Sequence, residues 1–149
     1  MEHEKWMHEA LLEAQKAFNK GEVPIGAVVV GGNRIIGRGH NMTQQLNDVT
    51  AHAEMIAITA AESVIGKYLD NCSLYVTLEP CLMCAGAIGW SQLKEIIYGA
   101  TDPKKGYTTY LAHGKSVLHP NARIINGILK EECTALLSEF FLNKRMKFT

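Results

Sequence analysis

The chain has 149 residues, the length of one ordinary domain, and hydrophobic residues make up 47% of it while charged residues make up 20%. This composition excludes a disordered or low-complexity chain and predicts a single domain over residues 1–149. The 15 basic and 15 acidic residues give a formal net charge of zero, so any nucleic-acid partner must meet a local basic patch. No segment reaches the ~18 apolar residues that span a bilayer, and the first residues are too acidic for a secretory signal. We therefore expect a cytoplasmic protein without a membrane partner.

The spacing of apolar residues predicts the helices and strands in chain order. Gly31-Gly32-Asn33 separates two β-branched runs, which is typical of a hairpin turn. The predicted elements are a helix over about Glu4 to Asn19, strands over Ile25 to Val30 and Arg34 to Ile36, a loop over His40 to Val49, a helix capped by Thr50 and running to about Val64, a strand over Leu74 to Leu78, a short helix over Cys81 to Trp90, a strand over Glu95 to Tyr98, an irregular stretch over Thr101 to Asn121, a strand at Ile124-Ile125 and a closing helix over Glu131 to about Lys144.

This order of elements predicts the fold class. A hairpin followed by alternating strands and helices favours one mixed sheet with helices on both faces. We therefore expect an α/β protein with three layers, α/β/α, around a central mixed five-stranded sheet.

Two short motifs carry the chemistry: His52-Ala53-Glu54 and Pro80-Cys81-Leu82-Met83-Cys84. A C-x-x-C pair alone could be a redox pair or half of a zinc ribbon, but Cys81 and Cys84 share one helix face and can bind one ion. Both are expected in the first turn after Pro80, where the helix dipole stabilises thiolates.

His52, Cys81 and Cys84 together are three good zinc ligands. Three protein ligands and one open position form a catalytic zinc site, whereas structural sites close with four ligands. Glu54, two residues after His52, is then free to move protons as a general acid and base. The two other cysteines, Cys72 and Cys133, have no partner at metal spacing, so we expect them to be small buried residues.

The pattern H-x-E…P-C-x-x-C is the signature of zinc deaminases. Further stretches extend the match, and the chain resembles the bacterial tRNA-specific adenosine deaminases, of the cytidine/deoxycytidylate deaminase superfamily, over nearly its whole length. These stretches are residues 22–28, Asn41, residues 50–54, 75–81 and 83–87, Gly99-Ala100 with Asp102, residues 127–129, and Phe140-Phe141.

The resemblance implies a cytidine-deaminase-like fold, one Zn²⁺ per subunit and a homodimer that converts the wobble adenosine of a tRNA anticodon to inosine. It further implies that Asn41 hydrogen-bonds the flipped base or its ribose, that Ala53 offers backbone contacts to the base, and that Val28 and Leu78 line the pocket. Asn41 could equally form an Asx turn in its own loop.

The partner implied is a tRNA anticodon stem-loop, met by a basic surface that includes Lys104, Lys105 and Arg145. Cationic side chains near residue 145 also interact favourably with the dipole at the C-terminal end of a helix, and this role requires no RNA. Asp102 could contact the RNA, and its alternative role is to cap the turn before Pro103.

Three functions compete. The first is hydrolytic deamination of adenosine in a tRNA anticodon loop, with His52, Cys81 and Cys84 on the metal and Glu54 as the catalytic residue. The second keeps this chemistry but acts on a free nucleobase or nucleoside such as guanine, cytosine or cytidine. The third is a non-catalytic, zinc-stabilised binding module, against which Glu54 beside an open three-ligand site argues. Release of ammonia from a purine or pyrimidine by the zinc-loaded protein separates the enzymes from the module.

Overall fold

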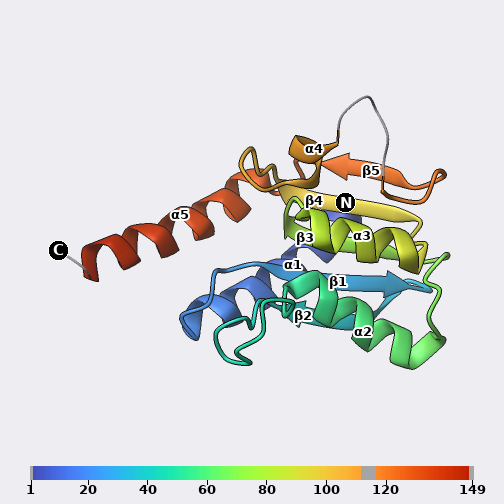
Figure 1. Cartoon of the computed structure of the whole chain (residues 1–149), viewed down its shortest axis with the longest axis horizontal. Coiled ribbons are helices and arrows are strands. Elements are labelled where there is room, and N and C mark those ends of the chain that lie inside the picture. Colours follow the sequence, from blue (N-terminus) through green and yellow to red (C-terminus); the bar gives the residue numbers. More distant parts are fainter. Residues whose placement is uncertain (1, 112–116, 148–149) are drawn as a thin grey trace.

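A computed structural model describes residues 2–111 and 117–147 of the chain. The described residues form five helices and five strands, and their order is the predicted one apart from the additional short helix α4 (Figure 1). They are α1 (Glu2–Asn19), β1 (Gly26–Gly31), β2 (Arg34–His40), α2 (Ala53–Ile65), β3 (Ser73–Leu78), α3 (Leu82–Ser91), β4 (Glu95–Ala100), α4 (Tyr107–Tyr110), β5 (Arg123–Asn126) and α5 (Lys130–Lys147).

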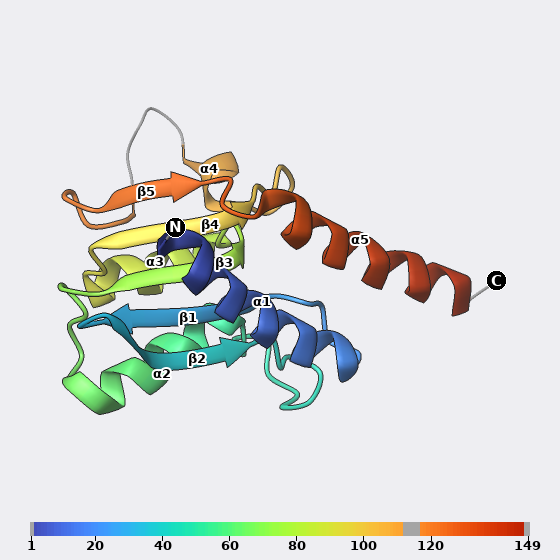
Figure 2. The ribbon, with the colours of Figure 1, turned by 180° about the vertical axis from the view of Figure 1, so that it is seen from behind.

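The strands form one mixed sheet in the order β2-β1-β3-β4-β5. β1 is antiparallel to both of its neighbours, whereas β3, β4 and β5 are parallel. The β1–β2 turn places Gly32 and Asn33 at φ of 58° and 61°, the two positive values that a type I′ hairpin turn needs. Helices α2 and α3 cover the face seen in Figure 1, and α1 covers the opposite face, seen in Figure 2. The predicted three-layer α/β/α architecture is confirmed.

Helix α2 packs closely on strand β2 because that strand carries two buried glycines. A Cβ atom on Gly37 would lie 2.3 Å from the carbonyl oxygen of Ala57, and one on Gly39 would lie 2.4 Å from that of Ala53. Any larger residue would push the helix away from the sheet. The glycines therefore fix the position of the first turn of α2, which begins directly after His52.

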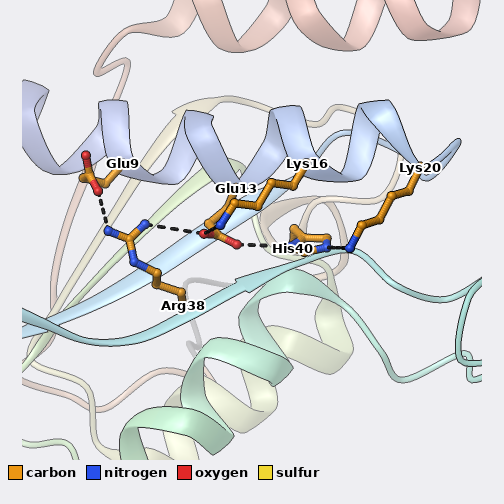
Figure 3. Close-up of polar contacts among 6 residues, drawn as sticks. All are labelled: Glu9, Glu13, Lys16, Lys20, Arg38 and His40. Carbon is orange, nitrogen blue, oxygen red and sulfur yellow. Dashed lines mark hydrogen bonds and ion pairs between the residues drawn. The ribbon is translucent and has the colours of Figure 1, made fainter.

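Helix α1 is joined to the edge strand β2 by a network of hydrogen bonds and ion pairs between side chains (Figure 3). The carboxylate of Glu13 is buried and lies 2.7 Å from Lys16 Nζ, 3.4 Å from Arg38 Nη1 and 3.0 Å from His40 Nδ1. Arg38 also pairs with Glu9. Because a buried carboxylate is costly unless it is paired, these contacts make Glu13 a stabilising link between α1 and β2.

Two local predictions are wrong at helix starts. Thr50 does not cap α2, because its backbone N–H and hydroxyl donate to Asp48 Oδ1 at 2.8 and 2.7 Å, and His52 itself occupies the N-cap. The helix predicted to begin at Cys81 begins at Leu82, and Cys81 is its N-cap. The stretch predicted as irregular contains the short helix α4, while its residues 112–116 lie outside the described part of the chain.

Helix α5 packs its first turns against the sheet through buried Cys133 and then extends beyond it (Figures 1 and 2). Among the described residues, none of the helices combines the length and the apolar character needed to cross a membrane.

Candidate active site

The N-termini of α2 and α3 bring three metal-ligating side chains together. His52 Nδ1 lies 3.6 Å from Cys81 Sγ and 3.5 Å from Cys84 Sγ, and the three ligand atoms all lie within 4.8 Å of one another. His52 and Cys81 are the N-caps of their helices, and Cys84 lies in the first turn of α3. The three residues that the sequence selects as metal ligands therefore form one compact cluster.

The spacing and chemistry of this cluster fit zinc. A tetrahedral zinc ion with bonds of about 2.1 Å to nitrogen and about 2.3 Å to sulfur places those two atoms about 3.6 Å apart. Both nitrogen–sulfur distances in the cluster agree with this separation. A set of one imidazole and two thiolates is also a soft donor set that suits zinc better than magnesium or calcium.

The electrostatics of the cluster stabilise a thiolate. The pKa of Cys81 is lowered to about 4, first by a hydrogen bond from the Cys84 thiol and then by His52, against the opposing effect of burial. The pKa of Cys84 is raised by that same hydrogen bond and by burial. The pKa of His52 is raised, chiefly by its hydrogen bond to Cys81. The N-terminal dipole of α3 also favours negative charge on these sulfurs.

Glu54 lies in the first turn of α2 and is buried beside the cluster, with 4% of its surface exposed. Burial raises the pKa of its carboxyl to about 7, and the negative charge of Cys81 adds to this. A carboxyl whose pKa is near 7 can both accept and return a proton at neutral pH, which is what a general acid–base residue must do.

The loop of residues 41–52 forms the surface around His52. Thr43, Gln44, Asn47, Asp48, Val49 and His52 line a hollow of about 380 Å³. Asn41 is buried at the end of β2, and its side-chain oxygen accepts a hydrogen bond from the backbone N–H of Thr43 at 3.4 Å. The Asx turn considered for Asn41 is therefore present, and its contact with a base stays a prediction.

A larger groove of about 1060 Å³ is lined by three of the predicted substrate-binding residues: Leu78, Asp102 and Arg145. Its apolar lining includes Val23, Ile25, Leu137 and Phe141, and its cationic residues are Lys104, Lys105, Lys144 and Arg145. Asp102 Oδ1 accepts hydrogen bonds at 3.1 Å from the backbone N–H groups of Lys104 and Lys105, so it caps the turn that presents these lysines.

The two other predicted substrate-binding residues are buried. Ala53 is the first residue of α2 and lies directly between His52 and Glu54, and its backbone contact with a base stays a prediction. Val28 is also fully buried and packs in the cluster that contains Trp6 and Met7 of α1. Since α1 covers the face opposite α2 and α3, the structure does not bring the Val28 side chain to the His52–Cys81–Cys84 cluster. The cause is strand alternation, which turns Ala27 and Val29 toward α2 and Val28 away from it.

Sequence reasoning gave no role to Glu22 and Glu79. Both carboxylates are nearly fully buried, at 1% and 4% exposure, and both accept hydrogen bonds from loops next to the metal cluster. The available signal in the sequence was a glutamate directly before a proline-containing pair, Val23-Pro24 or Pro80-Cys81. Cys72 and Cys133 are buried free cysteines, as predicted.

Comparison with known proteins gives one consistent family. Residues 1–145 match the MafB19-like deaminase family. The chain is 44% identical over 147 residues to the tRNA-specific adenosine deaminase of Bacillus subtilis (strain 168), with 97% of this chain and 91% of that protein covered.

Two solved structures extend this result. One, from a study of A-to-I editing by tRNA:A34 deaminases at the wobble position of transfer RNA, superposes with a TM-score of 0.79 at 39% identity and covers 89% of this chain and 98% of its own. This likeness confirms the expected cytidine-deaminase-like fold. The guanine deaminase of Bacillus subtilis superposes with a TM-score of 0.64 at 42% identity, but over only 68% of this chain and 66% of its own.

Proposed function

Because this chain belongs to the MafB19-like deaminases and, among them, to the tRNA-specific adenosine deaminases, we propose that it hydrolyses adenosine to inosine at the wobble position of a tRNA anticodon. The observation that carries the proposal is the triangle of His52, Cys81 and Cys84 with the buried carboxyl of Glu54 beside it. The near-complete alignment with a tRNA-specific adenosine deaminase supports adenosine in tRNA as the substrate.

One zinc ion per subunit would be held by His52, Cys81 and Cys84. When bound, zinc supplies a water that is deprotonated near neutral pH. The nitrogen–sulfur distances of 3.5 and 3.6 Å support this assignment.

Glu54 is the proton carrier of the reaction. Deamination replaces the exocyclic amino group of adenine with an oxygen from water and releases ammonia, so a proton must be taken from the water and delivered to the leaving nitrogen. The carboxyl of Glu54 is the buried titratable group next to the metal ligands and has a pKa of about 7. It can therefore accept the proton and return it to the amino group.

The groove beside Leu78 is the surface that would meet the RNA. Cations along it can contact phosphates, and its apolar lining can contact an unstacked base. A local arrangement of this kind explains how a chain of zero net charge binds an anticodon stem-loop. An unpaired loop base is also cheaper to extrude into a pocket than a paired one.

The alternative substrate is a free base, and the partial likeness to a guanine deaminase is the observation that favours it. The share of each relative that aligns with this chain distinguishes the two substrates. The chain aligns with 91% of a tRNA-specific adenosine deaminase and with only 66% of the guanine deaminase. The adenosine substrate is therefore the better supported.

The test is ammonia release by the zinc-loaded protein from an anticodon stem-loop with adenosine at the wobble position. The control RNA differs only by guanosine at that position. We expect turnover of the first RNA and none of the second, nor of free adenine, guanine or cytidine. Turnover of a free base without activity on the RNA would replace this proposal by the alternative.

Two further assignments complete the proposal. We expect the enzyme to act in the cytoplasm, as the sequence predicts, and to form a homodimer. Helix α3 exposes the apolar side chains Leu82, Met83 and Trp90, the last with 85% of its surface accessible. A second copy of the chain covering this helix would bury them.

A further inference from the structure

Glu22 and Glu79 are buried carboxylates with an unusual set of partners. Neither forms an ion pair with a lysine, arginine or histidine among the residues that the structure describes. Their hydrogen-bond donors are backbone N–H groups and threonine hydroxyls of two segments, residues 43–45 for Glu22 and residues 102–108 for Glu79. Because hydrogen bonds to a charged acceptor are strong, each carboxylate holds its loop in one conformation.

Glu79 holds the segment of residues 101–110. One carboxylate oxygen accepts from the backbone N–H of Asp102 at 3.0 Å. The other accepts from the backbone N–H and the hydroxyl of Thr108 at 3.1 and 2.6 Å. The segment is thereby fixed at both ends, and Lys104 and Lys105 lie between the two fixed points.

This segment adjoins the metal cluster directly. Gly106 forms an antiparallel bridge with Cys81, and the N–H of Tyr107 donates to the carbonyl oxygen of Pro80 at 2.8 Å. A Cβ atom on Gly106 would lie 2.2 Å from Glu79 Oε2, so the carboxylate fills the space that a side chain would need. Glu79 therefore holds a segment that lies directly beside the metal cluster.

Glu22 holds the loop of residues 41–52, which ends at the metal ligand His52. Its Oε1 accepts from the backbone N–H of Gln44 at 3.1 Å, and its Oε2 accepts from that of Gln45 at 2.7 Å. The hydroxyl of Thr43 also lies 3.5 Å from Oε1. This loop begins at Asn41 and lines the hollow beside His52.

We propose that Glu22 and Glu79 are positioning residues, which hold the loop next to His52 and the segment next to Cys81 in the conformation that receives the RNA. The proposal rests on the proposed function, since it assigns these two carboxylates to substrate placement in that reaction. Neither residue needs to contact the reacting base.

The first arm of the test measures amide hydrogen exchange and needs no activity. Glutamine offers one acceptor oxygen where glutamate offers two, and its NH₂ group would face a backbone donor. Loss of one such hydrogen bond should speed exchange about tenfold. Glu79→Gln should therefore accelerate the amides of Asp102 and Thr108 but not those of Gln44 and Gln45, and Glu22→Gln should do the reverse. If both variants leave all four amides unchanged, the proposal is overturned.

The second arm measures steady-state kinetics on the anticodon stem-loop with the zinc-loaded variants. Glu22→Gln and Glu79→Gln should each raise KM about tenfold, the effect of losing one charged hydrogen bond, with kcat at saturation and zinc content nearly unchanged. Thr108→Val should reproduce part of the Glu79→Gln effect, and Thr108→Ser should restore the wild-type KM. Thr108 is exposed, so neither substitution endangers folding.

Glu13→Gln is the matched control because Glu13 is also a buried carboxylate but links α1 to β2. It should lower the melting temperature and leave KM and both loops' exchange unchanged. Local exchange changes without a change in KM would overturn the positioning role while leaving the proposed function intact. An inactive wild type would instead overturn the proposed function and the role in receiving RNA, and the exchange pattern would still decide whether the carboxylates anchor the loops.

Discussion

His52 Nδ1 lies 3.6 Å from Cys81 Sγ although the two residues are 29 positions apart in the chain. Each is the N-cap of its helix, and α2 and α3 lie on the same face of the sheet (Figure 1). The positive ends of two helix dipoles therefore converge on one point, which favours negatively charged ligands there. The glycines of β2 fix the start of α2, and α3 begins at Leu82, four residues after the end of β3.

The first prediction concerns the metal. Cys84→Ala should lose bound zinc, because two ligands hold the ion much more weakly than three. Elemental analysis of the purified variant measures this directly. Cys72→Ala is the matched control, since Cys72 is a buried free cysteine outside the cluster, and it should retain one zinc per chain. Undiminished zinc in Cys84→Ala would remove this residue from the ligand set.

The second prediction concerns proton transfer. Glu54→Gln should keep its zinc and its fold but lose turnover by about 10²–10⁴-fold, the usual contribution of a positioned general acid–base group. Ammonia release at saturating RNA is the measurement. Glu62→Gln, in the same helix but eight positions later, should retain wild-type turnover. Near-normal activity of Glu54→Gln would show that another group carries the proton.

The metal cluster could be predicted from the sequence because its information is local. His52 and Glu54 lie in one motif, Cys81 and Cys84 lie in another, and both motifs mark helix starts.

The face of the sheet to which a strand residue points could also be predicted, because side chains alternate along a strand. This alternation turns Val28 away from α2. The partners of Glu22 and Glu79 were not available, since their loops lie 21 to 29 positions away and irregular loops have no periodicity. The prediction that Thr50 caps α2 was wrong because the Thr50 hydroxyl donates its hydrogen bond to Asp48 instead.

The third prediction is a pH dependence of stability. Burial alone would raise the pKa of Glu13, but hydrogen bonds from Lys16 and His40 more than offset this, and the pKa is lowered from 4.5. A lowered pKa means that the carboxylate stabilises the fold above the pH at which it ionises in the unfolded chain, near 4.5, and that this stabilisation is lost as the pH falls below it. Glu13→Gln should therefore reduce the melting temperature by about 5 °C at pH 7 and by less at pH 4. Thermal scans at both pH values check this, and an equal loss at both would contradict it.

The fourth prediction concerns the oligomeric state. Light scattering should give a dimer at micromolar concentration, and Trp90→Asp should give a monomer because it places a charge in the apolar surface of α3. Leu12→Asp is the control, since Leu12 is 56% exposed but lies on α1, across the sheet from α3. A monomeric wild type would refute the homodimer.

The fifth prediction concerns RNA binding by the groove that contains Arg145. If Arg145 contacts a phosphate, Arg145→Ala should weaken binding of the anticodon stem-loop and leave kcat at saturation nearly unchanged, because the residue lies outside the metal cluster. The logarithm of the affinity falls with the logarithm of the salt concentration by about 0.7 per phosphate neutralised on a single strand. The salt slope of Arg145→Ala should therefore be shallower by about 0.7 than that of the wild type. Arg34→Ala removes an exposed arginine at the β1–β2 hairpin, remote from the groove, and should leave the slope unchanged. Equal slopes for Arg145→Ala and the wild type would mean that Arg145 serves the C-terminal end of α5 and does not contact RNA.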